Sequence, residues 1–373
     1  MAPKFSYYLM LFTLLLFPIC LAAEESIKPL EIGSAAPNFN LPGIDGKNYT
    51  LNNFNKAEIL VVIFTANHCP TAQAYENRIM QLVADYEKKS VAVVCISSNS
   101  PEALRLDEMG YSDLGDTFEE MKIRAKDKGF NIPFLYDGDT QTVGKAYGAQ
   151  ATPHVFVFDK ARELRYTGRF DDSEKPEKIT SHDTRNAIDA LLAGKPAPVA
   201  VTKSFGCSIK WASKKESAKK ALEKWNAEPV TLEKIGLAGI KKLIQNDSEN
   251  LRLLNVWATW CGPCVAEFPE LIAINRMYRY REFEMVTLSA DDPEIGDKVL
   301  KFLQKNHASG KNYHFELDDV YKLIEAVDPD WQGALPYTLL IKPGGKISYK
   351  KQGMIDPLEV KKAIVEELGR YYK

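Results

Sequence analysis

The chain has 373 residues, which is enough for two domains of ordinary size, each with its own core. It carries 48 Lys and Arg against 50 Asp and Glu, and the formal net charge is −2. A balance this close to neutral gives no general attraction to nucleic acids or acidic membranes, so we expect no nucleic-acid partner.

The first 23 residues have the composition of an export signal. Lys4 precedes an uncharged stretch over residues 5–23, and Ala22 and Ala23 suit a cleavage site before Glu24. An uncleaved anchor is the alternative, because the stretch is nearly long enough to span a bilayer. Both alternatives predict a protein that acts outside the cytoplasm, in the periplasm or cell envelope.

Residues 30–200 have the pattern of one α/β domain. Turn residues between short apolar pieces predict a hairpin within residues 32–54. A buried strand is expected over 58–64, a helix over 71–89 and a further strand over 91–96. Beyond these we expect a polar helix over 116–128, strands over 154–158 and 163–168, and a helix over 183–192.

A linker is expected over residues 201–229. The stretch GKPAP over 194–198 ends the first domain, and a lysine-rich stretch over 212–224 has helical spacing. A helix-like segment over 231–245 opens a second domain, which fills residues 230–373.

The order of motifs repeats between the two halves. One cysteine in each half lies 32 residues before a proline, and one proline in each half lies 13 residues before a tyrosine. Periodicity of this kind indicates a duplicated architecture. The pairs are Cys69 and Pro101, Cys261 and Pro293, Pro153 and Tyr166, and Pro336 and Tyr349.

The strongest motif lies within residues 251–268, which read LRLLNVWATWCGPCVAEF. Cys261 and Cys264 fall where an apolar run, typical of a buried strand, turns into a helix. A helix N-terminus favours a thiolate, and two thiols at this spacing beside a strand–helix unit are typical of a redox motif. A zinc site would need two more ligands, which His307 and His314 do not supply at ligand spacing, so we expect no metal.

The sequence WCGPC after an apolar strand resembles the thioredoxin superfamily. Asn255 in the strand and Glu267-Phe268-Pro269 in the helix resemble its TlpA-like and ResA-like extracytoplasmic branch. The resemblance implies the α/β class, with two tandem thioredoxin-like domains that each have a mixed central sheet flanked by helices.

The resemblance also assigns roles to residues around the motif. Cys261 is expected to be the nucleophile and Cys264 the resolving thiol. Trp260 and Pro336 are expected to align the substrate, the proline in its cis form. Glu267, one helical turn after Cys264, is expected to transfer protons at the dithiol. The alternative for Glu267 is a solvated carboxylate on the helix surface.

In the first half, Asn67-His68-Cys69-Pro70 resembles the AhpC/TSA redoxins, a peroxiredoxin-like group. Cys69 aligns with Cys261, but Ala72 takes the place of the second thiol. An alanine also stands three residues before Cys69, where peroxiredoxins carry threonine. This domain therefore keeps the nucleophile position and lacks its resolving partner.

Other residues of the first domain could support Cys69. A charged His68 beside it would favour the thiolate. Cys207, in a loop-like segment, is expected either to resolve Cys69 or simply to pack, and Pro153 is expected to align substrates like its counterpart in the second half. Cys95 is expected in the core, while His154 either faces Cys69 or caps a strand, and Arg169 either supports the thiolate or lies at the surface.

These features predict an exported thiol–disulfide oxidoreductase, a protein-disulfide reductase that needs no cofactor. Protein or small-molecule disulfides are the expected substrates, and a membrane-bound thiol reductant is the expected partner. One alternative is a thiol peroxidase recycled by the second domain. Another is a client-binding, chaperone-like protein with incidental redox activity. Because the two domains share a chain, we also expect Cys69 to form a disulfide with Cys261 that Cys264 releases, with Cys207 as the rival resolving thiol.

Overall fold

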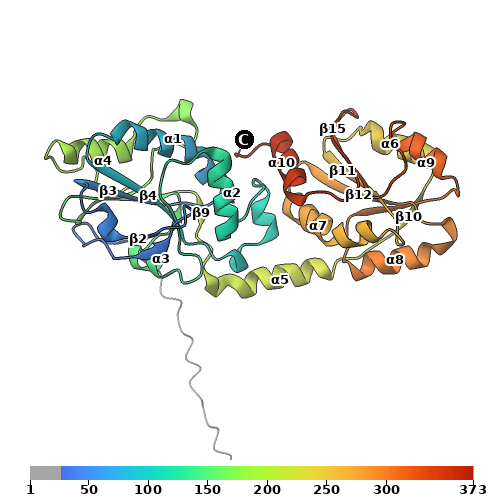
Figure 1. Cartoon of the computed structure of the whole chain (residues 1–373), viewed down its shortest axis with the longest axis horizontal. Helices are drawn as coiled ribbons and strands as arrows, with labels where there is room; N and C mark the ends of the chain where they lie inside the picture. Colours follow the sequence, from blue (N-terminus) through green and yellow to red (C-terminus); the bar gives the residue numbers. More distant parts are fainter. Residues whose placement is uncertain (1–26, 373) are drawn as a thin grey trace, which may run out of the picture.

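The computed structural model describes residues 27–372, and the export signal expected over 1–23 lies outside the described residues. The described chain forms two lobes side by side, with a long helix, α5 (Lys215–Asn226), running along both (Figure 1). Each lobe has its own β-sheet with helices packed against it, which confirms the expected α/β class and tandem arrangement. None of the helices between residues 27 and 372 combines the length and the apolar composition of a membrane span.

The first lobe is organised around β3 (Ile59–Phe64), all of whose residues are buried. β4 (Val91–Ser97) and β5 (Phe134–Tyr136) extend the sheet in parallel on one side. β7 (His154–Phe158) and β8 (Leu164–Gly168) extend it in antiparallel fashion on the other. Because β3 has no polar position, both faces of this mixed sheet must be covered.

Helices cover both faces. One face carries the three helices α1 (Pro70–Tyr86), α2 (Phe118–Lys128) and α4 (Asp183–Leu192). The other face carries α3 (Thr142–Tyr147) and the hairpin of β1 (Asn40–Pro42) and β2 (Asn48–Thr50). The expected hairpin and the helix over 183–192 are therefore confirmed.

The first lobe extends further along the chain than its composition indicates. Residues 201–211, expected in the linker, pack on this lobe. β9 (Cys207–Ser208) pairs in antiparallel fashion with β6 (Ala151–Thr152), and Ile209 is buried in the core. A strand of two residues is too short to show an alternation of apolar and polar side chains. The sequence pattern therefore could not assign this segment to the first lobe. The bridge between the lobes is α5 and the residues around it.

The second lobe has a sheet of six strands. They are β10 (Glu233–Ile235), β11 (Leu251–Trp257), β12 (Phe283–Ser289), β13 (Lys311–Phe315), β14 (Tyr337–Ile341) and β15 (Ile347–Gln352). Their order is β10-β13-β12-β11-β14-β15, and the pairs β11–β14 and β14–β15 are antiparallel. The helix expected over 231–245 is wrong in its first half, because β10 pairs with β13 and α6 (Leu237–Gln245) begins only after it.

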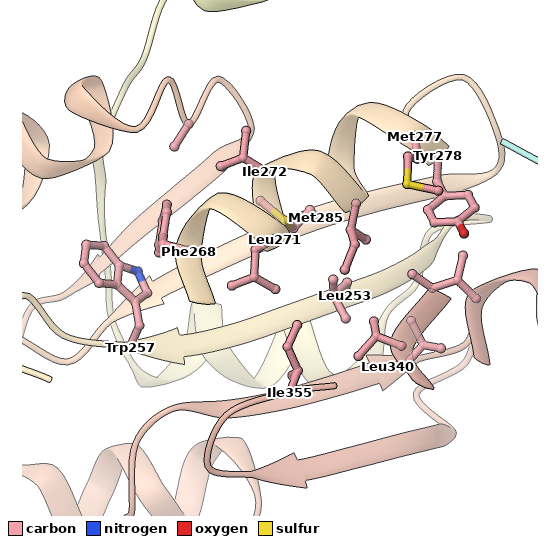
Figure 2. Packing of buried hydrophobic residues seen from close by; sticks show 14 of the residues in the cluster. Leu253, Trp257, Phe268, Leu271, Ile272, Met277, Tyr278, Met285, Leu340 and Ile355 are labelled. Atoms are coloured by element: carbon pink, nitrogen blue, oxygen red, sulfur yellow. The ribbon is translucent and has the colours of Figure 1, made fainter. Parts of the chain in front are cut away.

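Helix α7 (Gly262–Tyr278) follows β11 directly and packs along it. Figure 2 shows Phe268 and Leu271 of α7 pointing toward the sheet, with Trp257 near the beginning of the helix and Tyr278 at its other end. With 17 residues, α7 is about 25 Å long. The remaining helices are α8 (Gly296–Lys305), α9 (Val320–Val327) and α10 (Pro357–Leu368).

The far end of α7 packs against the first lobe. The short helical turn η3 (Leu106–Met109) places Met109 in the same apolar cluster as α7. Close by, the hydroxyl of Tyr278 donates a hydrogen bond to the carbonyl oxygen of Ser112 at 2.9 Å. The two lobes are therefore held together by buried packing at the end of α7 that lies farthest from Cys261.

Candidate redox sites

Cys261 and Cys264 lie at the beginning of α7 and form a disulfide, with Cα atoms 5.3 Å apart. Cys261 is the N-cap residue, and its sulfur accepts a hydrogen bond from the backbone N–H of Cys264 at 3.2 Å. Pro263 is tolerated in this first turn, because its missing N–H would have no partner within the helix. In the reduced form, the N–H group and the helix dipole both favour a thiolate on Cys261.

The two sulfurs lie at different depths. Cys261 is 6 % exposed and Cys264 is 1 % exposed, so Cys261 is the more accessible. Trp260, directly before them, is 67 % exposed. A large indole held this far into solvent beside a disulfide offers an apolar contact to a docking polypeptide.

The loop that contains Pro336 lies on the same side of the second lobe. The Leu335–Pro336 bond is cis, as expected, and Leu335 packs against the cluster that contains both cysteines. The carbonyl oxygen of Pro336 accepts a hydrogen bond from the N–H of Gly353 at 2.8 Å. The next residue, Met354, is exposed. Trp260 and Met354 are thus two exposed apolar side chains from the segments that carry the site.

Glu267 is buried, and the alternative of a solvated surface carboxylate is wrong. One carboxylate oxygen accepts from Nδ2 of Asn255 at 3.1 Å, and the other accepts from the N–H of Ile355 at 2.9 Å. Burial raises the pKa of Glu267 above its ordinary 4.5, although both hydrogen bonds oppose the shift. A carboxyl group with a raised pKa, one turn beyond Cys264, is suited to accept and return a proton.

Cys69 has the corresponding position in the first lobe. It is the N-cap residue of α1, which has 17 residues like α7. Its sulfur accepts from the N–H of Ala72 at 3.3 Å and lies 3.1 Å from the carbonyl oxygen of Thr152, to which its thiol donates. The Thr152–Pro153 bond is cis, like its counterpart in the second lobe. The duplication thus extends to the cap and the proline, with Ala72 in place of a second thiol.

A buried ion pair lies beside Cys69. Nδ1 of His68 is 2.5 Å from Oδ2 of Asp116, and both side chains are almost fully buried. Burial opposes the charge on each group, but the pairing outweighs it, raising the pKa of His68 and lowering that of Asp116. Asp116 also accepts from the N–H of Asn67 and the side-chain amide of Asn99. The pairing with Asp116 therefore favours the charged form of the imidazole next to the thiol.

Cys207 lies beside Cys69. In β9 it is paired with Thr152, the residue to which Cys69 donates, and it packs against the apolar cluster around Cys69. The Cys207 side chain is therefore a packing neighbour of the Cys69 cluster. Gly206 permits this approach: its φ is +134°, and a Cβ atom there would lie 2.1 Å from the Thr152 oxygen.

The two thiols have opposite tendencies to ionise. Burial raises the pKa of Cys69, but the nearby Cys207 thiol and the charged His68 outweigh it, and the net pKa lies below the ordinary value. The pKa of Cys207 is raised, first by its contact with Cys69 and then by burial. Of the two thiols, Cys69 is therefore the one that ionises more readily, and on ionisation it gives up the proton that it otherwise donates to Thr152.

The other expected residues of the first lobe lie away from this chemistry. Cys95 is buried in β4, and burial raises its pKa to about 12. His154 does not bond to Cys69, since its ring nitrogens contact the N–H of Gln150 and the hydroxyl of Thr167. Arg169 pairs with a carboxylate of α4 rather than with a thiolate.

A stretch of the second lobe reaches the first-lobe site. Following α10, Arg370 pairs with Asp113 at 2.5 Å, and the ring of Tyr372 meets that of Tyr111 with centroids 4.8 Å apart. Burial and electrostatic interactions with both Cys207 and Cys69 raise the pKa of the Tyr372 phenol. The sequence gives no signal for Asp116 or Tyr372, because each meets the cysteines only through tertiary contacts.

The two sites are separated by the length of α7. Cys261 begins the helix, whereas the first lobe packs against its other end, about 25 Å away. Disulfide exchange requires sulfur atoms to approach to about 2 Å. The expected relay from Cys69 to Cys261 is therefore not possible in this arrangement, and Cys207 is the thiol beside Cys69.

Comparison with known protein families gives one match for each lobe. Residues 32–167 match the AhpC/TSA family, and residues 218–365 match the Redoxin family. Two similar curated proteins are thiol-disulfide oxidoreductases named ResA, from Oceanobacillus iheyensis (32% identical over 104 residues) and Bacillus subtilis (32% over 94 residues). The matches cover 28% and 25% of this chain and 50% and 48% of those proteins. The chain thus spans about half the length of these relatives.

A solved structure is also similar to this chain. It is a hypothetical protein from Sinorhizobium meliloti, with 35% sequence identity and a TM-score of 0.44. The similarity covers 50% of this chain and 97% of that one.

Proposed function

Because this chain belongs to the thioredoxin superfamily, with one redoxin-type domain in each half, we propose that it is a thiol–disulfide oxidoreductase. Its principal centre is the dithiol of Cys261 and Cys264, and its substrates are protein disulfides. The similarity of part of the chain to thiol-disulfide oxidoreductases named ResA supports the reaction class. The observation that carries the proposal is the placement of both cysteines in the first turn of α7, above the buried Glu267.

The reduced dithiol acts in two exchange steps. The Cys261 thiolate attacks one sulfur of the substrate disulfide, and the other substrate sulfur leaves as a thiolate. Cys264 then loses its proton and attacks Cys261, which releases the second substrate thiolate. The protein ends with the Cys261–Cys264 disulfide that the structure contains, and the substrate has gained two electrons. A thiol reductant then restores the dithiol.

Glu267 serves the second of these steps. Cys264 is nearly inaccessible to solvent, so its proton needs a nearby acceptor within the protein. The carboxyl of Glu267 is fixed by Asn255 and the N–H of Ile355, and its raised pKa brings it closer to that of a thiol than an exposed glutamate would be. Ionised Glu267 accepts the proton of Cys264 during oxidation and returns it during reduction.

Protein rather than small disulfides fit the surface around this centre. Trp260 and Met354 are exposed beside the site and provide apolar contacts for a polypeptide. The loop with the cis Leu335–Pro336 bond leaves the backbone of Ala334 and Leu335 outside any strand of the sheet. An incoming segment could pair with this backbone while its disulfide meets Cys261.

The proposal also includes export. The composition of residues 1–23 supports a secretory signal, and a site outside the cytoplasm would require a membrane-bound thiol reductant as electron donor. Detection of the protein in the cytoplasmic fraction alone, with residues 1–23 retained, would contradict this part of the proposal.

Turnover of a protein disulfide tests the central part. The protein, supplied with a thiol reductant, is expected to reduce insulin, and Cys261→Ser is expected to abolish the reaction. Cys69→Ser is the matched control, because it removes the corresponding N-cap thiol of the other lobe, and it should retain activity. Insulin reduction by the Cys261→Ser variant would refute the assignment.

A further inference from the structure

We propose that Cys69 and Cys207 are a second redox-active pair, which reacts with low-molecular-weight disulfides and is covered by residues 369–372 of the second lobe. This site is separate from the Cys261–Cys264 dithiol. It can be tested in a protein that lacks both of those cysteines, so its failure and that of the proposed function are distinguishable.

The backbone brings the two sulfurs together. β9 pairs with β6 immediately before the cis Pro153, so Cys207 lies opposite Thr152, whose carbonyl oxygen also contacts the Cys69 thiol. Gly206 allows β9 to approach so closely, since any Cβ atom there would collide with the Thr152 oxygen. A short strand, a glycine and a helix N-cap thus converge on one pair of cysteines.

The electrostatic surroundings divide the roles within the pair. Four ionisable groups from different segments interact electrostatically with the pair: His68, Asp116, Lys210 and Tyr372. His68 is almost fully buried and pairs through Nδ1 with Asp116, while its Nε2 has no hydrogen-bond partner among residues 27–372. An imidazole held charged with a free N–H stabilises negative charge on the adjacent Cys69. Cys69 is therefore the attacking thiolate.

The proposed reaction consumes one small disulfide, R–S–S–R. The Cys69 thiolate attacks one sulfur, forming a mixed disulfide and releasing R–S⁻. Cys207 then attacks the Cys69 sulfur, displacing the second R–S⁻, and the proton of Cys207 converts one of the two thiolates to R–SH. The protein gains the Cys69–Cys207 disulfide, and the substrate gains two electrons.

The surroundings of Cys69 favour small substrates. The backbone edge before Pro153, which corresponds to the open edge in the second lobe, is already paired with β9. The residue before the nucleophile is His68, which is 1 % exposed, whereas its counterpart Trp260 is 67 % exposed. The first lobe therefore lacks the free edge and the exposed aromatic ring that a polypeptide would contact.

Residues 369–372 cover the pair. Tyr372 packs on Tyr111 and interacts electrostatically with Cys207, and Arg370 pairs with Asp113. Arg281 holds the beginning of the same segment, donating to the carbonyl oxygen of Gly369 at 3.2 Å. Cys69 itself has no exposed surface. In the proposal, the segment contributes to this burial and moves away to admit an external disulfide.

The first test uses the full chain with Cys261→Ser and Cys264→Ser. The reduced protein is treated with 2-hydroxyethyl disulfide, and its cysteines are mapped by mass spectrometry under non-reducing conditions. A Cys69–Cys207 link is expected, while the buried Cys95 stays reduced. The pairing is overturned if Cys69 and Cys207 both stay reduced or if they carry only separate mixed disulfides.

The second test measures the rate at which this link forms when the cover is loosened. Arg370→Gln removes the ion pair between Arg370 and Asp113. Asp113 still has a cationic neighbour, because Nη1 of Arg124 lies 3.9 Å from its carboxylate. The rate is expected to rise about tenfold, because one charge-assisted hydrogen bond is lost. Lys362→Gln is the matched control. It breaks the ion pair between Lys362 and Asp127, which also joins the two lobes but does not involve residues 369–372. The rate should therefore stay unchanged. Equal rates in the parent and Arg370→Gln proteins would overturn the covering role.

Discussion

Replacement of Glu267 by glutamine tests the proposed proton path at the Cys261–Cys264 centre. The substitution keeps the size of the side chain and removes its charge. Disulfide exchange is expected to slow by about 100-fold, the lower end of what a positioned acid–base group contributes. The protein is expected to remain folded, because glutamine can still form hydrogen bonds to the neighbours of Glu267.

The predicted effect on stability follows from those bonds. Glutamine can still accept from the N–H of Ile355 through its oxygen. Its amide nitrogen would face Nδ2 of Asn255, but Asn255 can turn its amide over, because its Oδ1 has no partner within the described part of the chain. Oδ1 would then accept from both the new amide and Thr338, whose hydroxyl now accepts from Nδ2. After this turn Nδ2 takes the buried place in which Oδ1 has no partner, so the free energy of unfolding should fall by no more than about 1–3 kcal/mol.

Stability should also depend on pH in a defined direction. A carboxyl whose pKa is raised by folding stabilises the folded state fully below its ordinary value of 4.5. That contribution is lost as the pH rises through the raised value. Relative to the parent, the Glu267→Gln protein should therefore be more stable at about pH 8 than at about pH 4 in urea unfolding.

The assay is the rate of insulin reduction as a function of pH. In the parent, the rate should rise with pH as Glu267 ionises, and the variant should lack this part of the profile. Glu270→Gln, in the exposed part of the same helix, is the matched control and should behave like the parent. Superimposable profiles for the parent and Glu267→Gln would refute the proton-transfer role.

Three further predictions concern single residues. Gly206→Ala should prevent formation of the Cys69–Cys207 link and lower the free energy of unfolding by about 1–3 kcal/mol, measured in urea, because the new Cβ atom would collide with a backbone oxygen. Asp116→Asn should move the pH profile of that link's formation to higher pH, since the unpaired imidazole loses its charge and no longer stabilises the thiolate. Trp260→Ala should lower kcat/KM for insulin but not for 2-hydroxyethyl disulfide, because only a polypeptide reaches the exposed indole.

Each of these has a control or an outcome that would contradict it. Gly194→Ala also places alanine at a positive φ but meets no atom within 4 Å, so the Cys69–Cys207 link should still form. For Asp116→Asn, an unchanged pH profile would show that the carboxylate has only a structural role. For Trp260→Ala, an equal loss with both substrates would indicate damage to the dithiol rather than loss of a docking contact.

The duplicated fold and the second-lobe dithiol could be predicted from sequence because their signals are local. An apolar strand that turns directly into a helix places Cys261 at the N-cap through chain connectivity alone. The first lobe has the same signal around Cys69, and Pro336 is cis as expected, as is Pro153, for which no cis form was predicted. Strand, turn and helix each leave a pattern within about 20 residues, which sequence reading can detect.

The partners of Cys69 could not be predicted in the same way. Asp116 follows Cys69 by 47 positions in the chain and Cys207 follows it by 138, and Tyr372 belongs to the other lobe. β9 has two residues and α5 follows it closely, so its pairing with β6 leaves no periodic pattern. The burial of Glu267 could not be predicted either, because a glutamate at this distance from the motif can lie on the buried or the exposed side of the helix. Its contact with the N–H of Ile355, which is distant in sequence, places it on the buried side.

Capture of a substrate on a single cysteine tests the central claim most directly. A Cys264→Ala variant, reduced and then mixed with insulin, cannot complete the second exchange step and should retain a mixed disulfide. Peptide mapping under non-reducing conditions is expected to find insulin attached to Cys261. Attachment to Cys69 or Cys207, or no attachment under conditions in which the parent reduces insulin, would contradict the account.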